Sequence, residues 1–303
     1  MTQPSPQTLA VGPLAQALAT ANGSSTSLGV LSFNVLAPLW AAPKWYPTNL
    51  DPATLNRQTR LRATQALLGS LSGQLDVVCL QEVNAPEFKG YLNALGPDFK
   101  GAMAQNPPSW WANWLVPELP WEANGTAVIV RKSRFKGGSF EDVALPDGNH
   151  AEVYQGVDSL TGQKVRVQSI HLDSDRLDNH KIELTTLFDR YPASRGVVDI
   201  LAGDFNEDTD IGTAASLLER AGYKNALTAI GNLEATHPWS SRYNTNQRWG
   251  RIDHITSRNA ISLGGDVLDF GVWSLTDETT RIAANLGKTG SDHFPVIANL
   301  GAA

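Results

Sequence analysis

The chain has 303 residues, enough for one large hydrophobic core, and its apolar segments are spread evenly after residue 28. We therefore expect a flexible leader over residues 1–27 and one domain over residues 28–303. Lysine and arginine total 24 against 30 acidic residues, and the net charge of −6 argues against a tight, processive nucleic-acid binder. The single cysteine, Cys79, excludes a disulfide framework within the chain.

The first residues carry no sign of export. Residues 1–27 contain no lysine or arginine and lack the charged start of a secretory signal. The weakly apolar stretch at residues 9–21 is shorter than the roughly 20 apolar residues that cross a bilayer. The sequence therefore predicts a soluble, cytoplasmic protein, and we expect a monomer.

Strands and helices alternate along the predicted chain. The expected strands lie near residues 28–36, 75–80, 125–131, 151–157, 164–172, 197–202, 251–257, 267–273 and 294–300. The expected helices lie near residues 52–71, 86–95, 176–190 and 211–221. In the first helix, Asp51 is the expected N-cap and Pro52 the first helical residue. This alternation favours the α/β class.

An apolar run at residues 197–201 leads directly into Gly203-Asp204-Phe205-Asn206. Residues two apart in an extended segment point the same way, so Asp204 and Asn206 can face one reaction centre. The carboxylate could hold a metal ion or orient water, and the amide could hold a phosphate oxygen. The alternative is an Asx-rich turn before the next helix.

Two more polar residues belong to apolar strands. Glu82 follows a buried strand, where a hard cation such as Mg²⁺ would compensate its charge. The alternative is a surface glutamate that caps the helix beginning near Pro86. Asn34 interrupts another apolar strand and needs a partner, either a metal-bound water or phosphate, or a neighbouring backbone group.

Histidines supply the proton chemistry of the predicted site. His171 ends a strand and could donate to a developing oxyanion or to a leaving oxygen. His293 follows Asp292, and Asp253 offers a carboxylate that could fix the tautomer of His293. The alternatives are a structural His171, a turn histidine at position 293 and a surface salt bridge.

Six short blocks carry these residues. The blocks are Phe33-Asn34-Val35, Leu80-Gln81-Glu82-Val83, Ile170-His171-Leu172, Gly203-Asp204-Phe205-Asn206, Arg251-Ile252-Asp253-His254 and Ser291-Asp292-His293-Phe294-Pro295. In this order they resemble the signature blocks of the endonuclease/exonuclease/phosphatase superfamily, over residues 28–300. The resemblance implies a DNase I-like catalytic domain, a sandwich of two mixed β-sheets flanked by helices with the active site at one end.

The resemblance also implies a role for each residue. Glu82 is similar to the principal Mg²⁺ ligand, with Asn34 and Asp292 close to the same cation and Mn²⁺ as a substitute. The remaining positions correspond to catalytic groups. Asp204 and Asn206 would position water and phosphate, His171 would contact the phosphate, and His293, oriented by Asp253, would act as general base or phosphate-polarising imidazole.

Other sequence segments give information about the substrate. Phe33-Asn34-Val35-Leu36-Ala37 and the block from Asn124 to Ala127 resemble the deadenylase and nocturnin branch, which makes Asn124 a candidate substrate contact. The acidic chain departs from that more basic branch, so poly(A) is not implied. Arg248 and Arg251 flank Trp249, an arrangement that suits a phosphate beside a base or sugar. The alternative is a solvated loop.

Tryptophans crowd the proline-rich segment at residues 107–121. They are Trp110, Trp111, Trp114 and Trp121. This segment could be a lid that stacks nucleobases, a loop that dips into a membrane, or a small satellite core.

We therefore predict a Mg²⁺-dependent phosphodiesterase that acts on nucleic acid or nucleotides, most simply a nuclease. One alternative is a phospholipid hydrolase of the sphingomyelinase type or an inositol-phosphate hydrolase. The other is a binding module that keeps the fold without turnover, which the completeness of the polar set disfavours.

Overall fold

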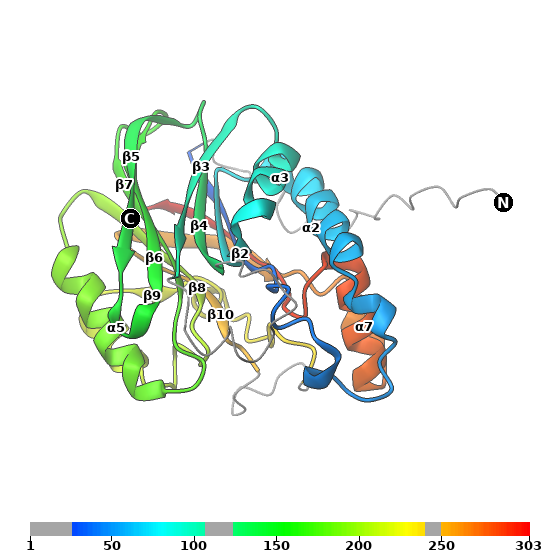
Figure 1. Cartoon of the computed structure of the whole chain (residues 1–303). Helices are drawn as coiled ribbons and strands as arrows, with labels where there is room; N and C mark the ends of the chain where they lie inside the picture. The colour runs from blue at the N-terminus through cyan, green and yellow to red at the C-terminus, as the bar shows by residue number, and fades with distance from the viewer. Residues whose placement is uncertain (1–25, 107–123, 240–249) are drawn as a thin grey trace.

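The computed structural model describes residues 26–106, 124–239 and 250–303. Within them, two six-stranded sheets pack face to face, and helices cover their outer faces (Figure 1). The strand orders are β11-β12-β1-β2-β4-β3 and β5-β6-β7-β8-β10-β9. Both sheets are mixed, since β1 pairs in parallel with β2, β7 pairs in parallel with β8, and the other pairings are antiparallel. The predicted α/β sandwich is confirmed.

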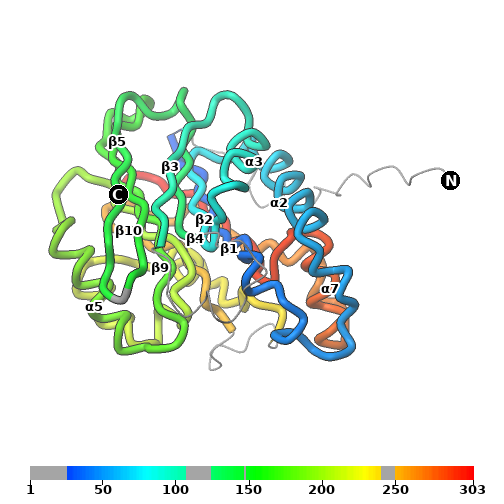
Figure 2. Tube along the Cα trace, viewed as in Figure 1, coloured from blue at the N-terminus to red at the C-terminus, as the bar shows by residue number. Residues whose placement is uncertain are grey.

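The first sheet contains the first and last strands of the described chain. Its strands are β11 (Ala260–Val267), β12 (Val296–Ala302), β1 (Leu28–Asn34), β2 (Val77–Asn84), β4 (Asn124–Arg131) and β3 (Phe99–Gln105). In Figure 2 the trace passes from β1 through α2 to β2, and β12 pairs with β1 near the centre of the sheet. Helices α2 (Arg57–Leu71) and α3 (Ala85–Leu95) pack on the outer face through residues such as Leu67, Leu71 and Tyr91. Helix α7 (Glu278–Thr289) lies beside α2 (Figure 1).

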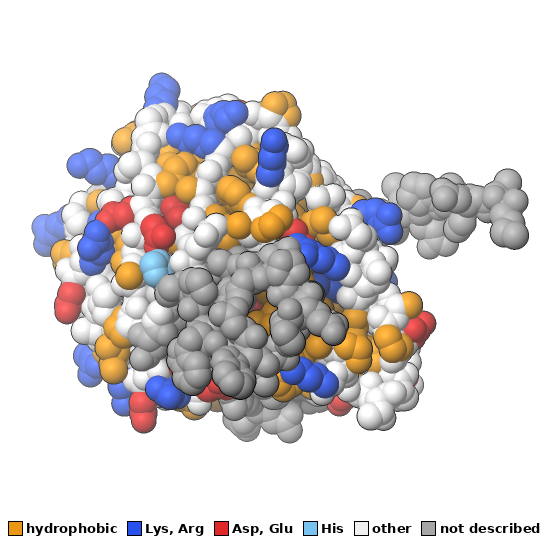
Figure 3. Space-filling model, in the orientation of Figure 1, with side chains coloured by type: hydrophobic (Ala, Val, Ile, Leu, Met, Phe, Trp, Pro, Cys, Tyr) orange, Lys and Arg blue, Asp and Glu red, His pale blue; other side chains and the backbone are white. Residues whose placement is uncertain are grey.

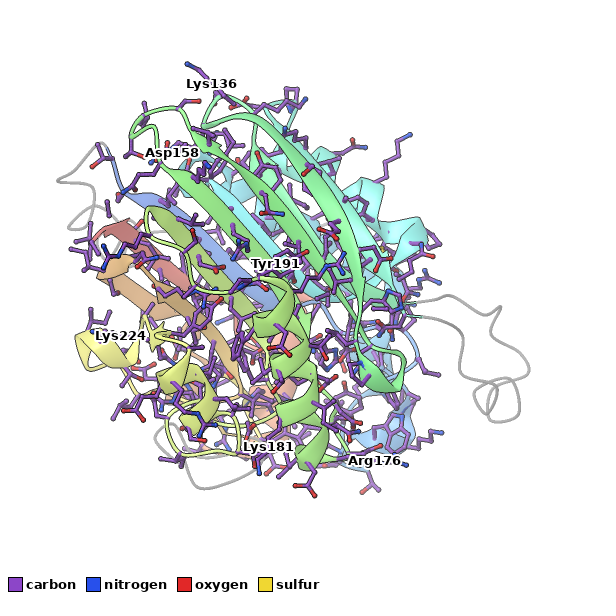
Figure 4. The ribbon with its side chains drawn as sticks, turned by 90° about the vertical axis from the view of Figure 1, so that its left-hand side faces the viewer. Lys136, Asp158, Arg176, Lys181, Tyr191 and Lys224 are labelled. Atoms are coloured by element: carbon purple, nitrogen blue, oxygen red, sulfur yellow. The ribbon has the colours of Figure 1, made fainter. Side chains whose placement is uncertain are left out.

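The second sheet carries its helices on the opposite outer face. Its strands are β5 (Phe135–Ala144), β6 (His150–Asp158), β7 (Lys164–His171), β8 (Val197–Asp204), β10 (Asp253–Arg258) and β9 (Lys224–Asn225). Helix α5 (Leu177–Arg190) runs across this face (Figure 4), and α6 (Ala215–Arg220) follows β8. Leu184 and Leu187 of α5 are fully buried against the sheet.

The two sheets meet in a core of small and β-branched side chains. Val30 and Val128 of the first sheet pack with Val167 and Ile200 of the second. Alternate residues of these strands face the core, and their neighbours face the covering helices, so the central strands are apolar on both faces. Polar side chains are therefore concentrated where the strands end.

Short 3₁₀ helices connect the larger elements. They are η1 (Pro43–Trp45), η2 (Pro52–Leu55), η3 (Ser72–Gln74), η4 (Pro146–Gly148), η5 (Thr228–Ile230) and η6 (Val272–Ser274). Among the described residues, no helix has both the length and the apolar character needed to span a bilayer.

The predicted helix at residues 52–71 is two helices. Asp51 caps only η2, by accepting a hydrogen bond from the Ala53 amide at 2.9 Å. The chain then leaves the helical conformation at Asn56, whose side chain accepts from the Thr59 amide at 3.1 Å and begins α2. The asparagine side chain competes with the helical backbone for this amide, so it interrupts a continuous apolar pattern.

The predicted strand at residues 267–273 is wrong. Strand β11 ends at Val267, and Phe270 and Gly271 take positive φ angles of 50° and 77°. The Asp269 carboxylate accepts from the amides of Gly271 and Trp273, so these apolar residues form a turn that leads into η6. Leu268 of the turn and Val272 at the start of η6 are both buried, which explains their misleading pattern.

Several elements lack a clear sequence signal. Strands β3, β5 and β11 and helix α7 were not predicted, because the strands lie at or near sheet edges with glycines and exposed residues. Helix α7 buries Ile282 and Leu286 beside polar Asn285. Helix α6 begins at Ala215 rather than near residue 211, since Glu207 accepts from the amides of Thr213 and Ala214 and holds the preceding turn.

Candidate active site

Polar side chains from both sheets meet at one end of the sandwich. In the second sheet, the register places His171 of β7 and Asp253 of β10 on either side of Asp204 of β8. In the first sheet, β1 ends at Asn34. The Asn34 amide nitrogen donates to Glu82 Oε1 at 2.9 Å and to Asp204 Oδ2 at 3.0 Å, so one side chain joins the two sheets.

Glu82 reaches this position through an irregularity in β2. The pairing of β2 with β4 shifts between Leu80 and Val83, and Glu82 has a φ of 56°. A non-glycine residue in this left-handed region costs about 1–3 kcal/mol, which other contacts must offset. One such contact is the Ala37 amide, which donates to Glu82 Oε2 at 2.8 Å. The bulge turns the buried carboxylate toward the strand ends.

Asn206 also has an unusual backbone conformation, with a φ of 52°. Its amide donates to Asp204 Oδ1 at 2.8 Å, and its side-chain nitrogen donates to the Leu172 carbonyl at 2.8 Å. The Leu172 amide in turn donates to the Asp204 carbonyl at 3.0 Å. The loops that follow β7 and β8 are therefore bonded directly to each other beside the catalytic candidates.

His293 and Asp253 form the hydrogen-bonded pair that the sequence predicts. His293 Nδ1 lies 2.8 Å from Asp253 Oδ2, and Nε2 lies 3.8 Å from Asp204 Oδ2. Burial alone would lower the pKa of His293, but the charges of Asp253, Asp204 and Asp292 raise it well above its usual value. The bond to Asp253 leaves Nε2 as the nitrogen directed at Asp204, the geometry required of a general acid or base.

Asp204 lies between two histidines. Its Oδ2 is 3.7 Å from His171 Nε2 and 3.8 Å from His293 Nε2. Burial would raise the pKa of Asp204, but His171 and His293 and the Asn34 hydrogen bond outweigh it and lower the pKa. Asp204 therefore stays ionised, and it can orient water or stabilise a neighbouring positive charge.

Asp292 has two neighbours that the motif blocks do not contain. The Tyr46 hydroxyl donates to Asp292 Oδ2 at 2.9 Å, and His237 Nε2 lies 3.8 Å from the same oxygen. Burial would raise the pKa of Asp292, but the neighbouring His237 and the charge of His293 lower it strongly. The pKa of Tyr46 is raised by burial and by Asp292.

The donor set fits a hard divalent cation. Glu82 and Asp292 are each 8% exposed, and two buried carboxylate oxygens, Asp292 Oδ1 and Asp253 Oδ1, have no hydrogen-bond partner. Asp292 also lies in a His237, Asp292 and His293 group whose donor atoms are all within 4.8 Å of one another. Carboxylate and amide oxygens are the ligands that Mg²⁺ prefers.

Arg251 and Asn124, two of the predicted substrate contacts, have hydrogen-bond partners of their own. Arg251 is only 3% exposed, and its guanidinium bonds to both oxygens of Asp208 and to Asp210. It thus forms a buried ion pair instead of presenting a free guanidinium. Asn124 begins β4 at the same end as Glu82 and accepts from Asn106 at 3.4 Å. Arg248, Trp249 and the tryptophan segment at residues 107–121 lie outside the described residues.

The charged surface agrees with the modest net charge. Among the described residues on the face in Figure 3, lysine and arginine side chains are scattered and form no continuous basic field.

The arrangement can be compared with known proteins. The sequence model of the Endonuclease/Exonuclease/phosphatase family matches residues 31–293. The chain belongs to this family. The six blocks identified in the sequence lie within or at the edge of the matched region, so the predicted resemblance is confirmed. No curated protein matches the chain.

Solved structures of family members share the fold. The endonuclease/exonuclease/phosphatase from Bacteroides vulgatus has a TM-score of 0.65 at 17% identity, covering 92% of this chain and 100% of that one. The human nocturnin catalytic domain has a TM-score of 0.65 at 16% identity, with 92% and 94% covered. TDP2 from D. rerio, in complex with a single-strand DNA product, has a TM-score of 0.60 at 18% identity, with 92% and 100% covered.

Sequence reasoning missed Tyr46 and His237. Both lie in loops outside the family blocks, so neither ends an apolar strand. The local signal for His237 is the segment Thr236-His237-Pro238-Trp239, in which the Thr236 hydroxyl accepts from the Ile252 and Asp253 amides. Polar residues before a proline are common in turns, and only the fold shows that this turn packs against the site.

Proposed function

We propose that the protein is a divalent-cation-dependent phosphodiesterase that uses water to cleave phosphodiester bonds in nucleic acid or nucleotides. The observation that supports this most directly is the Asn34 side chain, which bonds to Glu82 and Asp204 across the two sheets. It brings the cation-binding candidates and the His293–Asp253 pair into one site. The proposal includes a single catalytic domain over residues 28–303 that acts as a monomer.

In this proposal Glu82, Asn34 and Asp292 hold the cation, and Mg²⁺ is the expected ion. Bound there, the cation would supply positive charge to a phosphate that is otherwise repelled by the surrounding carboxylates. Tyr46 and His237 hold Asp292 in place through the oxygen that they share. The amide of Asn34 keeps Glu82 and Asp204 at a fixed separation.

The remaining residues handle the phosphate and the protons. Asp204 orients the attacking water, and the imidazolium of His293, which Asp253 stabilises, polarises a phosphate oxygen through Nε2. His171, whose side chain is 20% exposed, faces the site and donates to a phosphate oxygen. Asn206 is held between the two loops, and the second N–H of its side-chain amide can be donated to the same group. Charge that grows on the phosphate therefore meets several fixed donors.

The substrate class rests on the family and its solved members. TDP2 binds a single-strand DNA product, and ANGEL2, a 2′,3′-cyclic phosphatase, has been solved with adenosine-2′,3′-vanadate. These likenesses favour nucleic acid or nucleotides over lipid headgroups and inositol phosphates. They do not select DNA or RNA.

A panel of phosphodiesters tests the proposal. Purified protein with Mg²⁺ is incubated with DNA, RNA, poly(A), dinucleotides, sphingomyelin and inositol phosphates, and products are measured with and without EDTA. We expect cleavage of a nucleotide-containing substrate that EDTA abolishes. Release of a lipid or inositol headgroup alone would refute the substrate class, and turnover unaffected by EDTA would refute the cation.

A pair of glutamate variants tests the assignment of Glu82. Glu82→Gln should lower kcat by at least about 100-fold, because the carboxylate that holds the cation loses its charge. Glu87 is the matched control, since it is 7% exposed and bonds to Arg57 and Tyr91 on the outer face. Glu87→Gln should keep its activity. Equal activities in the two variants would contradict the role of Glu82.

A further inference from the structure

His180 is a fully buried histidine of α5 that contacts the loops following β7 and β8. Its Nδ1 is 2.6 Å from Glu207 Oε1, and its Nε2 is 2.7 Å from the Asp173 carbonyl oxygen. A carboxylate and a carbonyl both accept hydrogen bonds, so both ring nitrogens donate. The two bonds therefore require the charged imidazolium form of His180.

The two acceptors belong to the loops that follow β7 and β8. These strands end at His171 and Asp204, which with Asn206 form the phosphate side of the site. Asp173 lies two residues after His171, in the loop from β7 to α5. Glu207 follows Asn206 directly, in the loop from β8 to α6. One imidazolium thus bonds to both loops at once, next to the residues that carry the predicted chemistry.

Glu207 is itself fixed from several sides. Its carboxylate accepts from the Thr213 amide and, at 2.9 Å, from the Ala214 amide. Its carbonyl lies 3.1 Å from Nε2 of His254 in β10, the residue after Asp253. The His180 bond therefore connects α5 to a rigid segment rather than to a free side chain.

The charges around His180 favour its protonated form. Burial would lower the pKa of His180, but its bonds to Glu207 and to the Asp173 carbonyl raise it, with further contributions from the charges of Glu207 and Glu183. Glu183 lies on the same helix and accepts from the Asp173 amide at 3.2 Å. The His180 ring is therefore faced by the carboxylates of Glu183 and Glu207 and by the carbonyl of Asp173.

We propose that His180 is a positioning residue that sets the spacing between the β7–α5 and β8–α6 loops, so that His171, Asp204 and Asn206 face one phosphate group. The proposal rests on the phosphodiesterase function proposed above. It concerns the phosphate side only, because the two loops that His180 joins carry none of the cation-binding candidates. Asn34 and Glu82 belong to the other sheet, which meets this one through the Asn34–Asp204 hydrogen bond, and Asp292 is held by Tyr46 and His237.

The separation of the two sides provides a specific test. In His180→Gln, the neutral amide cannot replace the imidazolium at both loops, so the spacing of the phosphate-side residues should relax. We expect kcat to fall about 10- to 100-fold, since displacements near 1 Å can have effects of this size. The inhibition constant of inorganic phosphate should rise about tenfold. The Kd of Mn²⁺, measured by electron paramagnetic resonance, should not change.

Leu187→Ala is the matched control. Leu187 lies on the same helix, is also fully buried, and packs in the apolar cluster that contains Leu172 and Phe205, but its side chain forms no hydrogen bond to either loop. This variant should lower the Tm but leave kcat and the phosphate inhibition constant unchanged at a temperature where it is folded. The double variant His180→Gln with Glu207→Gln no longer buries an unpaired carboxylate, so it should recover part of the Tm lost in His180→Gln.

The outcomes separate the two proposals. If the wild-type protein hydrolyses no phosphodiester, the proposed function fails and the spacing of the loops has no substrate to act on. If the wild-type protein is active and His180→Gln keeps the same kcat and phosphate inhibition, the role of His180 is refuted. It is also refuted if the Mn²⁺ Kd rises in parallel with the phosphate inhibition constant, since a general loss of structure then explains both.

Discussion

At the scale of single residues, the site depends on how neighbouring charges offset burial. Asp204 and His293 are both buried, yet Asp204 keeps its charge because His171 and His293 lie within 4 Å, and His293 keeps its charge because Asp253 and Asp204 face it. Glu152 shows the opposite case. It is 2% exposed, its Oε1 has no hydrogen-bond partner, and Asp142 lies opposite it on β5. Burial, with the charge of Asp142, raises the pKa of Glu152 to about 8.

This pKa predicts a loss of stability with rising pH. The unfolded chain ionises Glu152 near its ordinary pKa of 4.5, while the folded chain keeps the proton up to about pH 8. The folded state therefore binds more protons across this window, so the free energy of unfolding falls as pH rises through it. Glu152→Gln removes this dependence. Urea denaturation should show similar stabilities at pH 5 and a variant more stable by about 1–3 kcal/mol at pH 9, allowing for screening by water.

An exposed glutamate provides the control. Glu219→Gln on α6 changes the same charge at an exposed position and should leave the pH dependence of unfolding unchanged. An equal stability difference between Glu152→Gln and wild type at both pH values would show that Glu152 ionises alike in the folded and unfolded chains.

At the scale of elements, the break between η2 and α2 fixes the position of a buried arginine. Asn56 begins α2, and Arg60 then bonds through Nη1 to the carbonyls of Leu36 and Gly290, both at 2.9 Å. These carbonyls belong to the loops that follow Asn34 and precede Asp292. The position at which α2 starts thus determines how the loop after Asn34 and the loop before Asp292 approach each other.

Loss of the cap should weaken this element. Asn56→Ala removes the acceptor for the Thr59 amide, and we expect a decrease of about 1 kcal/mol in the free energy of unfolding. Asp51→Ala is the comparison, because Asp51 caps only the short η2. Its effect in the same denaturation experiment should be smaller. A larger effect for Asp51→Ala would mean that the two helices behave as the single helix expected from sequence.

The sequence predicts the central elements better than the edges. Buried strands such as β1, β2 and β8 are continuous apolar runs, and the polar residues at their ends identify Asn34, Glu82 and Asp204. Edge strands have no comparable signal, and the glycines of β5 and β11 conceal them. Tyr46 and His237 were missed for a related reason, since their role comes from tertiary contacts with Asp292 and not from any local pattern.

At the scale of the whole molecule, each sheet supplies half of the site. Asn34 and Glu82 come from the first sheet, and His171, Asp204 and Asp253 come from the second. Within the protein, the Asn34 amide bridges the halves, and a bound cation and phosphate would add contacts to both. Ligands that bind only the folded state raise its stability by mass action.

If the cation and phosphate each contact residues of both sheets, we expect that together they stabilise the fold more than either does alone. Phosphate alone meets the charges of Glu82, Asp204 and Asp292, so it should change the Tm very little. With saturating Mg²⁺, whose charge offsets these carboxylates, phosphate at about 100 times its Kd adds about 2.7 kcal/mol and raises the Tm by about 5 °C. Differential scanning calorimetry with each ligand alone and with both measures this coupling.

Linkage makes the coupling reciprocal, so phosphate must also tighten the binding of Mg²⁺ by the same factor. Glu82→Gln should remove both the Mg²⁺ shift and the additional phosphate shift, whereas Glu87→Gln should keep them, because Glu87 lies outside the site. A phosphate shift of the same size with and without Mg²⁺ would place the two ligands at independent sites. It would then follow that the carboxylates of the two sheets do not act on one phosphate group.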